Sequence, residues 1–242
     1  MKKIIFNLVD FYISPLKWSA SLSLFAKHRI MQHNEHLLAA VHMIKRIENK
    51  IEGDVIDVGA FNGSTSIFFA KNFPGLKVTG FEPNPATFPQ AKKNCENYPG
   101  ISLKQVAVDQ EEGELDFFVS DNNLSSSLNR ITDNEQFSMK QQIKVKVMTL
   151  DGCLESVKLV LLIKLDTQGR ELKIMTGGTQ TLKKTKYILT EMNNHNYYEN
   201  GCQYYQVDAF LREHKFKLVN ISSGYNYAGM TEYDALYKNT EL

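Results

Sequence analysis

The stretch Asp57-Val58-Gly59-Ala60-Phe61-Asn62-Gly63 decides the fold of this chain. It closes the apolar run Val55 to Val58, which has the composition of a buried strand, and it precedes Ser64 to Asn72, which has the pattern of a helix. Gly59 and Gly63 lie in the turn between the two, where a missing Cβ lets the backbone approach a ligand closely. The stretch therefore predicts a strand-turn-helix unit that carries a ligand site in its turn.

The spacing of the glycines selects among ligands. A dinucleotide-binding turn would require glycine at positions 57, 59 and 62, but this chain has Asp57, Gly59 and Asn62. An acidic residue, one further residue and then glycine is instead typical of methyltransferases that use S-adenosylmethionine. That cofactor carries an ammonium and a sulfonium rather than a pyrophosphate, so an acidic group such as Asp57 suits it. An aspartate that only caps the end of a strand is the alternative.

A second carboxylate follows about 20 residues later in Phe81-Glu82-Pro83-Asn84-Pro85, at the end of the next predicted strand. In folds of this class, an acidic side chain at this place accepts hydrogen bonds from the two hydroxyls of a ribose. Glu82 is therefore the second candidate cofactor residue. A solvated glutamate at a strand end is the alternative, but the pair Asp57 and Glu82 at this spacing favours a nucleoside site.

The third predicted strand closes with Gln105-Val106-Ala107-Val108-Asp109. An adenine ring could rest on the apolar side chains here, while Asp109 or backbone groups contact its edge. An ordinary buried strand end is the equally weighted alternative. Val108 and Asp109 enter the candidate site on this basis.

Charged residues also interrupt the buried strand Val160 to Leu165, whose end reads Lys164-Leu165-Asp166. Charges at such a place need partners or a function. The fifth strand similarly ends at Glu191, with His195 shortly after it. If the strands are neighbours, Asp166 and Glu191 share one edge of the sheet. They could take the proton of a substrate hydroxyl, with Asp166 the preferred base and Glu191 and His195 behind it, or could hold Mg²⁺, which remains open and is not predicted.

The candidate site is thus a set of residues along one edge of the predicted sheet. The candidate cofactor-binding residues are Asp57, Gly59, Ala60, Gly63, Ser64, Glu82, Pro83, Asn84, Val108, Asp109 and Asp166, and the candidate catalytic residues are Asp166, Glu191 and His195.

From position 54 onward, short β-rich runs alternate with helical runs, which is the pattern of a doubly wound α/β sheet. The predicted strands are Val55–Val58, Lys77–Phe81, Ser102–Val106, Val160–Leu165, Tyr187–Glu191, Lys217–Ile221 and Asp234–Tyr237, and the predicted helices are Ser64–Asn72, Pro85–Asn97, Arg170–Lys183 and Tyr204–His214. Glu114–Val119 and Ile143–Val147 break the alternation as extra strands. They flank a polar segment with Ser125-Ser126-Ser127, and insertions at this edge commonly carry substrate loops.

Residues 1–50 form a helical extension to a domain that spans residues 51–242. Helices are expected over Ile4–Ile13 and from about Asn34, which is a plausible N-cap before Leu37, Leu38, Val41, Ile44 and Ile47. The aromatic side chains near the start are expected to pack on the core. A homodimer contact, a lid and a peripheral membrane contact through residues 1–30 stay open as alternatives.

Composition narrows the function further. The 28 Lys and Arg balance 27 Asp and Glu over 242 residues, without a basic stripe, so nucleic acid is not the expected partner. Three cysteines without ligand spacing argue against disulfides or zinc, and neither a signal peptide nor a run of roughly 20 apolar residues is present. These features predict a cytoplasmic protein without a transmembrane segment.

Taken together, the motifs resemble the FkbM family of methyltransferases. The resemblance covers roughly Asp54 to Lys238 and rests on six motifs in order: Asp57-Val58-Gly59-Ala60 with Gly63, Phe81-Glu82-Pro83-Asn84, Val106-Ala107-Val108, Thr149-Leu150-Asp151, Ile163-Lys164-Leu165-Asp166 with Gly169 and Glu171, and Asp234-Ala235-Leu236-Tyr237. It implies a Rossmann-like class I methyltransferase sheet of seven strands with an antiparallel last hairpin. It also implies S-adenosylmethionine as methyl donor, S-adenosylhomocysteine as product, and O-methylation of a hydroxyl on a sugar, a glycan or a secondary metabolite.

The chain departs from the common family pattern at two places. Phe61 stands where a small polar residue or histidine is frequent, and Thr167-Gln168 stand where Val-Glu is usual. Because Gln168 cannot act as an acid or base, a noncatalytic cofactor-binding or scaffold protein is the alternative to an O-methyltransferase. A nicotinamide-dependent oxidoreductase is the third hypothesis. Tyrosines in the C-terminal third could stack on a sugar, although interior packing is the commoner explanation for several of them, and carbohydrate is the leading expectation for the acceptor.

Overall fold

The computed structural model describes residues 24–121, 125–130, 132, 138–194, 198–222, 225–227 and 230–242, with side chains from residue 35 on except at 225–231. The chain divides into two compact units, Met1–Glu48 and Asn49–Leu242. In the first unit the structure describes one helix, α2 (Leu24–Ile47). The expected N-cap at Asn34 is wrong, because no proline or glycine stands between Leu24 and Asn34 and the helix passes straight through. The helix expected at Ile4–Ile13 lies outside the described residues.

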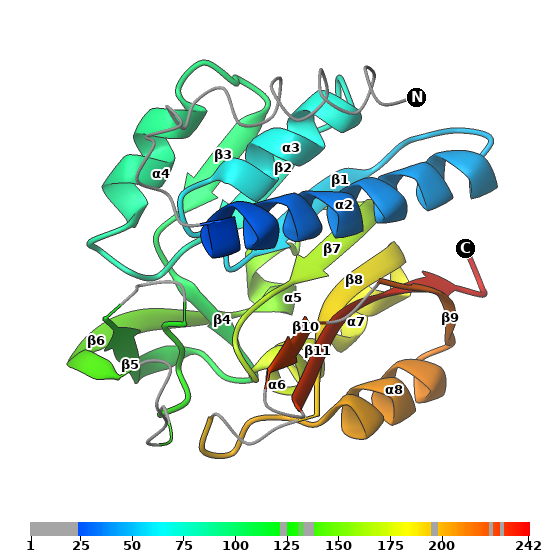
Figure 1. The fold of residues 1–242 in the computed structure, drawn as a ribbon. Coiled ribbons are helices and arrows are strands. Elements are labelled where there is room, and N and C mark those ends of the chain that lie inside the picture. Colours follow the sequence, from blue (N-terminus) through cyan, green and yellow to red (C-terminus); the bar gives the residue numbers. More distant parts are fainter. Residues whose placement is uncertain are drawn as a thin grey trace. The chain divides into compact units, whose positions relative to one another are not determined.

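The second unit is built on one large sheet, and Figure 1 shows its strands side by side. The strands are β1 (Asp54–Val58), β2 (Val78–Phe81), β3 (Ile101–Lys104), β7 (Val160–Leu165), β8 (Thr185–Asn193), β9 (Phe216–Ile221), β10 (Tyr225–Tyr227) and β11 (Met230–Asn239). The order runs β3-β2-β1-β7-β8-β11, and both β9 and β10 pair with β11. The strands from β3 to β8 are parallel, whereas β11 is antiparallel to β8 and to β9.

All seven predicted strands are present, and the antiparallel last hairpin is confirmed. The short β10 adds an eighth strand to the same edge. The chain places β2 and β3 on one side of β1, and β7 and β8 on the other, so the strand order reverses between β1 and β7. Ligands of open α/β sheets bind beside the carboxyl ends of the strands at such a point. The fold therefore places the turn after β1 where a ligand is expected.

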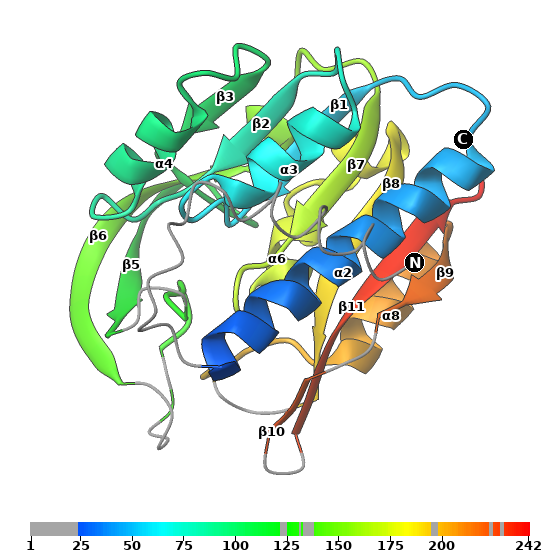
Figure 2. The same cartoon turned by 45° about the horizontal axis from the view of Figure 1, so that its top comes forward.

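Helices cover both faces of this sheet (Figures 1 and 2). On one face lies α3 (Ser64–Asn72), whose Ser66 contacts Asp57 of β1. On the other face the side chains of Ile56 and Val58 join a core formed with α5 (Leu150–Cys153), α6 (Glu171–Thr176), α7 (Thr179–Lys183) and α8 (Tyr204–Glu213). The remaining helix, α4 (Phe88–Cys95), is shorter than the predicted Pro85–Asn97.

The predicted helix Arg170–Lys183 is wrong as a single element, because Gly177 and Gly178 divide it into α6 and α7. A Cβ at Gly177 would lie 2.4 Å from the backbone oxygen of Asp109, and one at Gly178 would lie 2.7 Å from the Leu150 side chain. The two glycines thus allow the chain to pass close to neighbouring segments. The sequence pattern showed the apolar periodicity of the two helices but not this close approach.

The two extra strands are confirmed and form a second sheet with β4 (Ala107–Asp109), which pairs with β6 (Met139–Thr149), while β6 pairs with β5 (Gly113–Ser120). The expectation that the third strand continues through Val106 is wrong. The chain leaves the large sheet after Lys104, and Ala107–Asp109 pairs in parallel with Val147–Thr149. Strand β6 of the insertion therefore pairs with Ala107–Asp109, and these residues do not continue the pairing of β3 with β2. Figure 2 shows β5 and β6 as a curved ribbon.

None of the helices among the residues that the structure describes is long and apolar enough to cross a membrane. All three cysteines are free, with Cys95 and Cys153 buried.

Candidate functional site

The turn after β1 holds an unusual backbone. Gly59, Phe61 and Gly63 have φ angles of +87°, +48° and +82°. A Cβ at Gly59 would lie 2.0 Å from the backbone oxygen of Asp166, and one at Gly63 would lie 2.6 Å from Cys95 Sγ. Glycine is therefore needed at both positions. Because Gly59 has no side chain, the carboxyl end of β1 can lie against the carboxyl end of β7.

Glu82 closes β2 and fixes this turn from the side. Its Oε2 accepts a 2.8 Å hydrogen bond from the backbone N–H of Phe61, and its Oε1 accepts from the N–H of Asn84 and the hydroxyl of Thr87, both at 2.9 Å. The residue is 5% exposed. Burial raises its pKa to about 7, although these three donors act in the opposite direction. Glu82 therefore combines a fixed orientation with an unusually basic carboxylate.

Asp57 lies deeper, on the face of β1 that α3 covers. Ser66 donates a 2.6 Å hydrogen bond to its Oδ2, and its Oδ1 has no hydrogen-bond partner among the described residues. Burial raises the pKa of Asp57, whereas Lys164 and Ser66 lower it. An unpartnered buried carboxylate oxygen attracts positive charge.

Lys164 provides buried positive charge beside this carboxylate. It is aligned with Asp57 on the neighbouring strand, and its Nζ lies 2.8 Å from Asp166 Oδ2. Burial lowers the pKa of Lys164, but Asp166, Asp234 and Asp57 together outweigh burial, so the pKa is raised. The ammonium therefore stays charged, and it holds the Asp166 carboxylate in one position.

Asp166 is also linked to Glu191 through Gln168. The side-chain amide of Gln168 lies 3.1 Å from Asp166 Oδ1 and 3.3 Å from Glu191 Oε2. Burial raises the pKa of Glu191 well above its ordinary value, and Asp166, Glu232, Glu171 and Asp234 raise it further. The two carboxyl groups that the sequence placed at one edge are therefore brought together.

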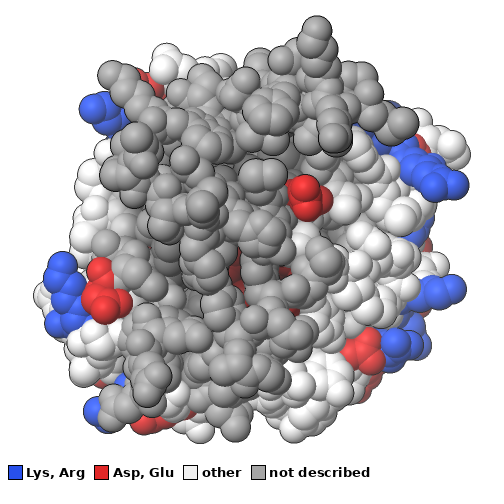
Figure 3. All heavy atoms as spheres, in the orientation of Figure 1, with Lys and Arg blue, Asp and Glu red and all other residues white. Residues whose placement is uncertain are grey.

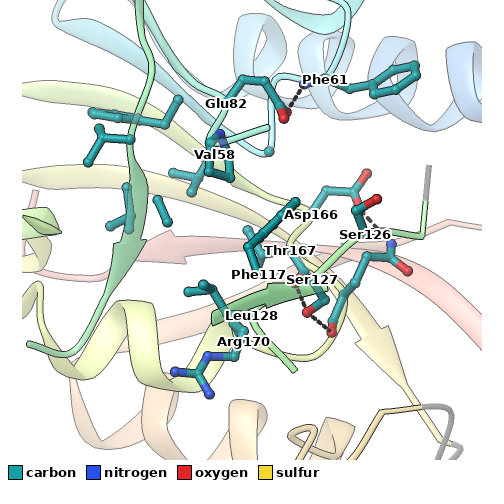
Figure 4. A pocket seen from close by; sticks show the side chains of 17 residues that line it. Val58, Phe61, Glu82, Phe117, Ser126, Ser127, Leu128, Asp166, Thr167 and Arg170 are labelled. Carbon is teal, nitrogen blue, oxygen red and sulfur yellow. Dashed lines mark hydrogen bonds between the residues drawn. The ribbon is translucent and has the colours of Figure 1, made fainter. Parts of the chain in front are cut away.

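A cavity of about 580 Å³, including the part open to solvent, lies over these strand ends (Figure 4). It is lined by Val58, Gly59, Phe61, Phe81, Glu82, Pro83, Val106, Ala107, Val108, Phe117, Ser126, Ser127, Leu128, Asp166, Thr167, Gln168 and Arg170. In Figure 4, Glu82 and Phe61 lie at one end of the view, and Leu128 and Arg170 lie at the opposite end. The mixture of apolar walls with a few polar groups is typical of a small-molecule site.

The insertion supplies one wall of this cavity. Ser127 Oγ lies 3.2 Å from the backbone oxygen of Thr167 and 3.0 Å from that of Gln168, and it accepts a hydrogen bond from the N–H of Asn129. Backbone hydrogen bonds in both directions join Ser127 to Phe118 of β5. The short segment around Ser127 is thereby fixed between β5 and the turn after β7.

The structure brings five of the predicted cofactor residues into the cavity wall, and these are Gly59, Glu82, Pro83, Val108 and Asp166. Asp57, Ala60, Gly63, Ser64, Asn84 and Asp109 are not among the lining residues. Of these, Asn84 donates a backbone hydrogen bond to Glu82, and Asp57 accepts a hydrogen bond from Ser66 of α3. His195 lies outside the described residues, so its role stays a prediction.

Asp109 is engaged elsewhere. Its carboxylate pairs with the guanidinium of Arg170, whose Nη1 also donates a 3.0 Å hydrogen bond to Asn129 Oδ1. Arg170, Thr167 and Phe117 line the cavity and were not among the predicted site residues. The sequence offered a signal for each of them, because Thr167 and Arg170 closely follow Asp166 and Phe117 lies in the insertion.

Charge on the face shown in Figure 3 is scattered. Within the part of the chain that the structure describes, Lys and Arg side chains lie near the periphery and alternate with Asp and Glu, without a continuous basic patch.

Comparisons with known proteins identify chains that this one is similar to. Residues 57–218, more than half of the chain, match the model of the methyltransferase FkbM domain. The 2-O-methyltransferase NoeI of Sinorhizobium fredii is 27% identical over 201 residues, which cover 78% of this chain and 80% of that protein. The hexuronic acid methyltransferase AglP of Haloferax volcanii is 24% identical over 151 residues, which cover 61% of this chain and 59% of that protein.

Among solved structures, the magnesium protoporphyrin IX methyltransferase of Synechocystis PCC 6803 with bound S-adenosylhomocysteine has a TM-score of 0.55 to this chain at 10% identity. The likeness covers 99% of this chain and 100% of that one. The same enzyme with bound S-adenosylmethionine has a TM-score of 0.53. At this identity the likeness shows a shared fold.

Proposed function

The chain belongs to the FkbM methyltransferase domain family, and we propose that it transfers the methyl group of S-adenosylmethionine to a hydroxyl of a sugar or glycan. The observation that carries this proposal is the Glu82 carboxylate, fixed by Phe61 beside the glycine turn of β1 in the wall of a cavity. The names of the relatives NoeI and AglP support O-methylation and a sugar acceptor.

The residues present fit this cofactor. The wall formed by Val106, Val108 and Phe117 offers an apolar surface for an adenine, and Glu82 offers an acceptor for ribose hydroxyls. Gly59 lines the same cavity, and its missing Cβ lets the backbone of Asp166 approach the turn after β1. Asp57 does not line the cavity, so it would act on the bound cofactor through its negative charge rather than through a direct contact.

S-adenosylmethionine supplies a methyl group on a sulfonium, which is already activated toward displacement. The protein's contribution is then mainly to align the acceptor hydroxyl, whose oxygen forms the new C–O bond as the C–S bond breaks. Asp166 lines the cavity and Glu191 is linked to it, so this pair is placed to take the hydroxyl proton. Lys164 pairs with Asp166 and holds the carboxylate in one orientation.

Calorimetry with S-adenosylhomocysteine tests the cofactor half of the proposal. We expect saturable heat with the wild-type chain and a large loss of affinity for Glu82→Ala, because the buried carboxylate is the main polar group toward the ribose. A folded wild-type sample that gives no heat at millimolar ligand would contradict cofactor binding.

Transfer of a labelled methyl group into cell extracts, followed by identification of the product, tests the acceptor half. Asp166→Asn and Glu191→Gln should lower the rate by roughly 10²- to 10⁴-fold while S-adenosylhomocysteine still binds, because they remove a proton acceptor rather than a cofactor contact. The alternative, a noncatalytic cofactor-binding protein suggested by Gln168, predicts binding without transfer to any acceptor.

A further inference from the structure

Gln168 occupies the position at which the common family pattern has a carboxylate, and its surroundings show what an amide does there. Its Nε2 lies within hydrogen-bond distance of both Asp166 Oδ1 and Glu191 Oε2, at 3.1 and 3.3 Å. An amide nitrogen carries two hydrogens, whereas an ionised carboxylate can only accept. One hydrogen is therefore available for each carboxyl group.

The orientation of this amide is fixed by Tyr198. The Tyr198 hydroxyl lies 2.5 Å from Gln168 Oε1 and 3.2 Å from the backbone oxygen of Ser125, and because both atoms can only accept, its one hydrogen is donated to the nearer of them, Gln168 Oε1. Tyr198 is 6% exposed, and burial raises the pKa of its hydroxyl, which therefore stays protonated. If the amide were reversed, its oxygen would face two carboxyl groups and its nitrogen would face a donor. Tyr198 thus directs the Gln168 nitrogen toward Asp166 and Glu191.

The backbone of Gln168 is fixed as well. Its φ is +59°, in the left-handed region that side-chain-bearing residues seldom adopt. Its carbonyl oxygen accepts from Ser127 Oγ at 3.0 Å, and the N–H of the preceding Thr167 donates to Glu171 Oε1 at 2.9 Å. Both contacts hold the turn, so the side chain of Gln168 begins from a defined point.

We propose that Gln168 is a positioning residue, which donates to Asp166 and Glu191 together and so keeps this pair in one arrangement and favours its ionised, proton-accepting form. This inference rests on the proposed function for its catalytic meaning. Hydrogen bonds to a carboxylate favour its charged form. Without the amide, the two acids would repel each other and would retain a proton more readily.

Several charged groups surround Glu191. They are Asp166 at the end of β7, Glu171 from α6, and Glu232 and Asp234 from β11, with the Tyr198 hydroxyl nearby and Lys164 beside Asp166 and Asp234. Lys164 is the cation of this group, and it is paired with Asp166. Gln168 is therefore the neutral donor that reaches Glu191 on the side of the cavity.

A carbon-13 titration of the Asp and Glu carboxyl groups of the full chain tests the proposal without an acceptor, with the signals assigned by Asp166→Asn and Glu191→Gln. Gln168→Met keeps the side-chain length and removes both donors. We expect it to shift the titration of the pair to higher pH, and Tyr198→Phe to cause a smaller shift in the same direction. The matched control is Tyr237→Phe, which removes a buried hydroxyl that donates to Asp208 at 2.8 Å, and it should leave the pair unchanged.

If Gln168→Met and Tyr198→Phe remain folded and the pair titrates as in the wild type, the proposal is wrong. Once an acceptor is known, Gln168→Met should lose roughly tenfold in methyl-transfer rate at neutral pH and regain rate at higher pH, with S-adenosylhomocysteine affinity within twofold of the wild type. A tenfold loss of that affinity would instead make Gln168 a cofactor contact and overturn the positioning role. Failure of the proposed function would appear separately, as absent cofactor binding in the wild type.

Discussion

At Gly59, a single missing Cβ lets the end of β1 lie against the end of β7. The φ of Gly59 is +87°, and an added Cβ would lie 2.0 Å from the backbone oxygen of Asp166. A backbone atom cannot move away without shifting β7, and Asp166 is part of the proposed proton-accepting pair. Gly59 therefore helps to set the position of this proposed pair.

Gly59→Ala should accordingly destabilise the fold by on the order of 3 kcal/mol, because backbone strain and a steric collision act together. Gly75→Ala is the matched control: Gly75 has a φ of +86°, but an added Cβ there meets nothing within 4 Å. Strain alone should cost about 1 kcal/mol at that site. Urea denaturation of both variants measures the difference. Equal losses would show that the contact with Asp166 has no cost.

The raised pKa of Glu82 makes the stability of the fold depend on pH. The folded state holds the Glu82 proton up to about pH 7, whereas the ordinary value is 4.5. The folded state thus binds this proton more tightly than the unfolded state, and the stability present below pH 4.5 is lost as the pH rises toward 7.

Glu82→Gln removes this titration, so the stability of the variant relative to the wild type should increase by on the order of 2 kcal/mol between pH 4.5 and pH 8. Urea denaturation at several pH values gives this difference. The absolute stability of the variant will also reflect the donors of Phe61, Asn84 and Thr87 that face the carboxylate, so the pH slope is the relevant quantity. A difference that stays constant with pH would refute the assignment.

Among the elements, the insertion of β5 and β6 contributes most to the shape of the site beyond the large sheet. Ser127 joins the insertion to the rest of the cavity wall through hydrogen bonds to the backbone oxygens of Thr167 and Gln168. Without this hydroxyl, the segment would keep the contact between Asn129 and Arg170, but two partly buried backbone acceptors of the turn after β7 would lose their donor.

Ser127→Ala should therefore weaken S-adenosylhomocysteine binding about tenfold, which corresponds to the loss of one net hydrogen bond of about 1.4 kcal/mol. Calorimetry measures the affinity. Ser138→Ala serves as the control, because the Ser138 hydroxyl contacts Asp121 on the exposed surface at 3.1 Å and should not affect binding. Unchanged affinity in Ser127→Ala would show that the insertion does not shape the cofactor site.

The large sheet could be predicted from the sequence because its strands are short apolar runs separated by helical ones, a local pattern. Gly59 and Glu82 were found by the same means, since a turn and a strand end are local features. The split of the helix at Gly177 was not, because its cause is a carbonyl of Asp109 that lies far away in sequence. The role of Gln168 depends likewise on Tyr198, which lies 30 residues away. Local patterns therefore locate a site but do not show which side chains meet in it.

For the whole molecule, the balance of 28 basic and 27 acidic residues means that binding should depend on the cavity rather than on net charge. Glu82 and Asp166, the two acidic residues in the cavity wall, favour a ligand with positive charge over a pyrophosphate. A methyltransferase and an oxidoreductase of similar fold should therefore respond differently to S-adenosylhomocysteine and to NADH. The thermal stability of the whole folded protein measures this response.

At a concentration of about 100 times its Kd, S-adenosylhomocysteine should stabilise the folded state by about 2.7 kcal/mol. For a chain of this size, that corresponds to a rise in Tm of roughly 5 to 10 °C. NADH at the same concentration should leave the Tm unchanged, because the turn after β1 has Asp57 and Asn62 where a dinucleotide needs glycine. Glu82→Ala should abolish the response to S-adenosylhomocysteine. A shift with NADH equal to or larger than that with S-adenosylhomocysteine would reject a methyl-donor site and favour a nicotinamide cofactor.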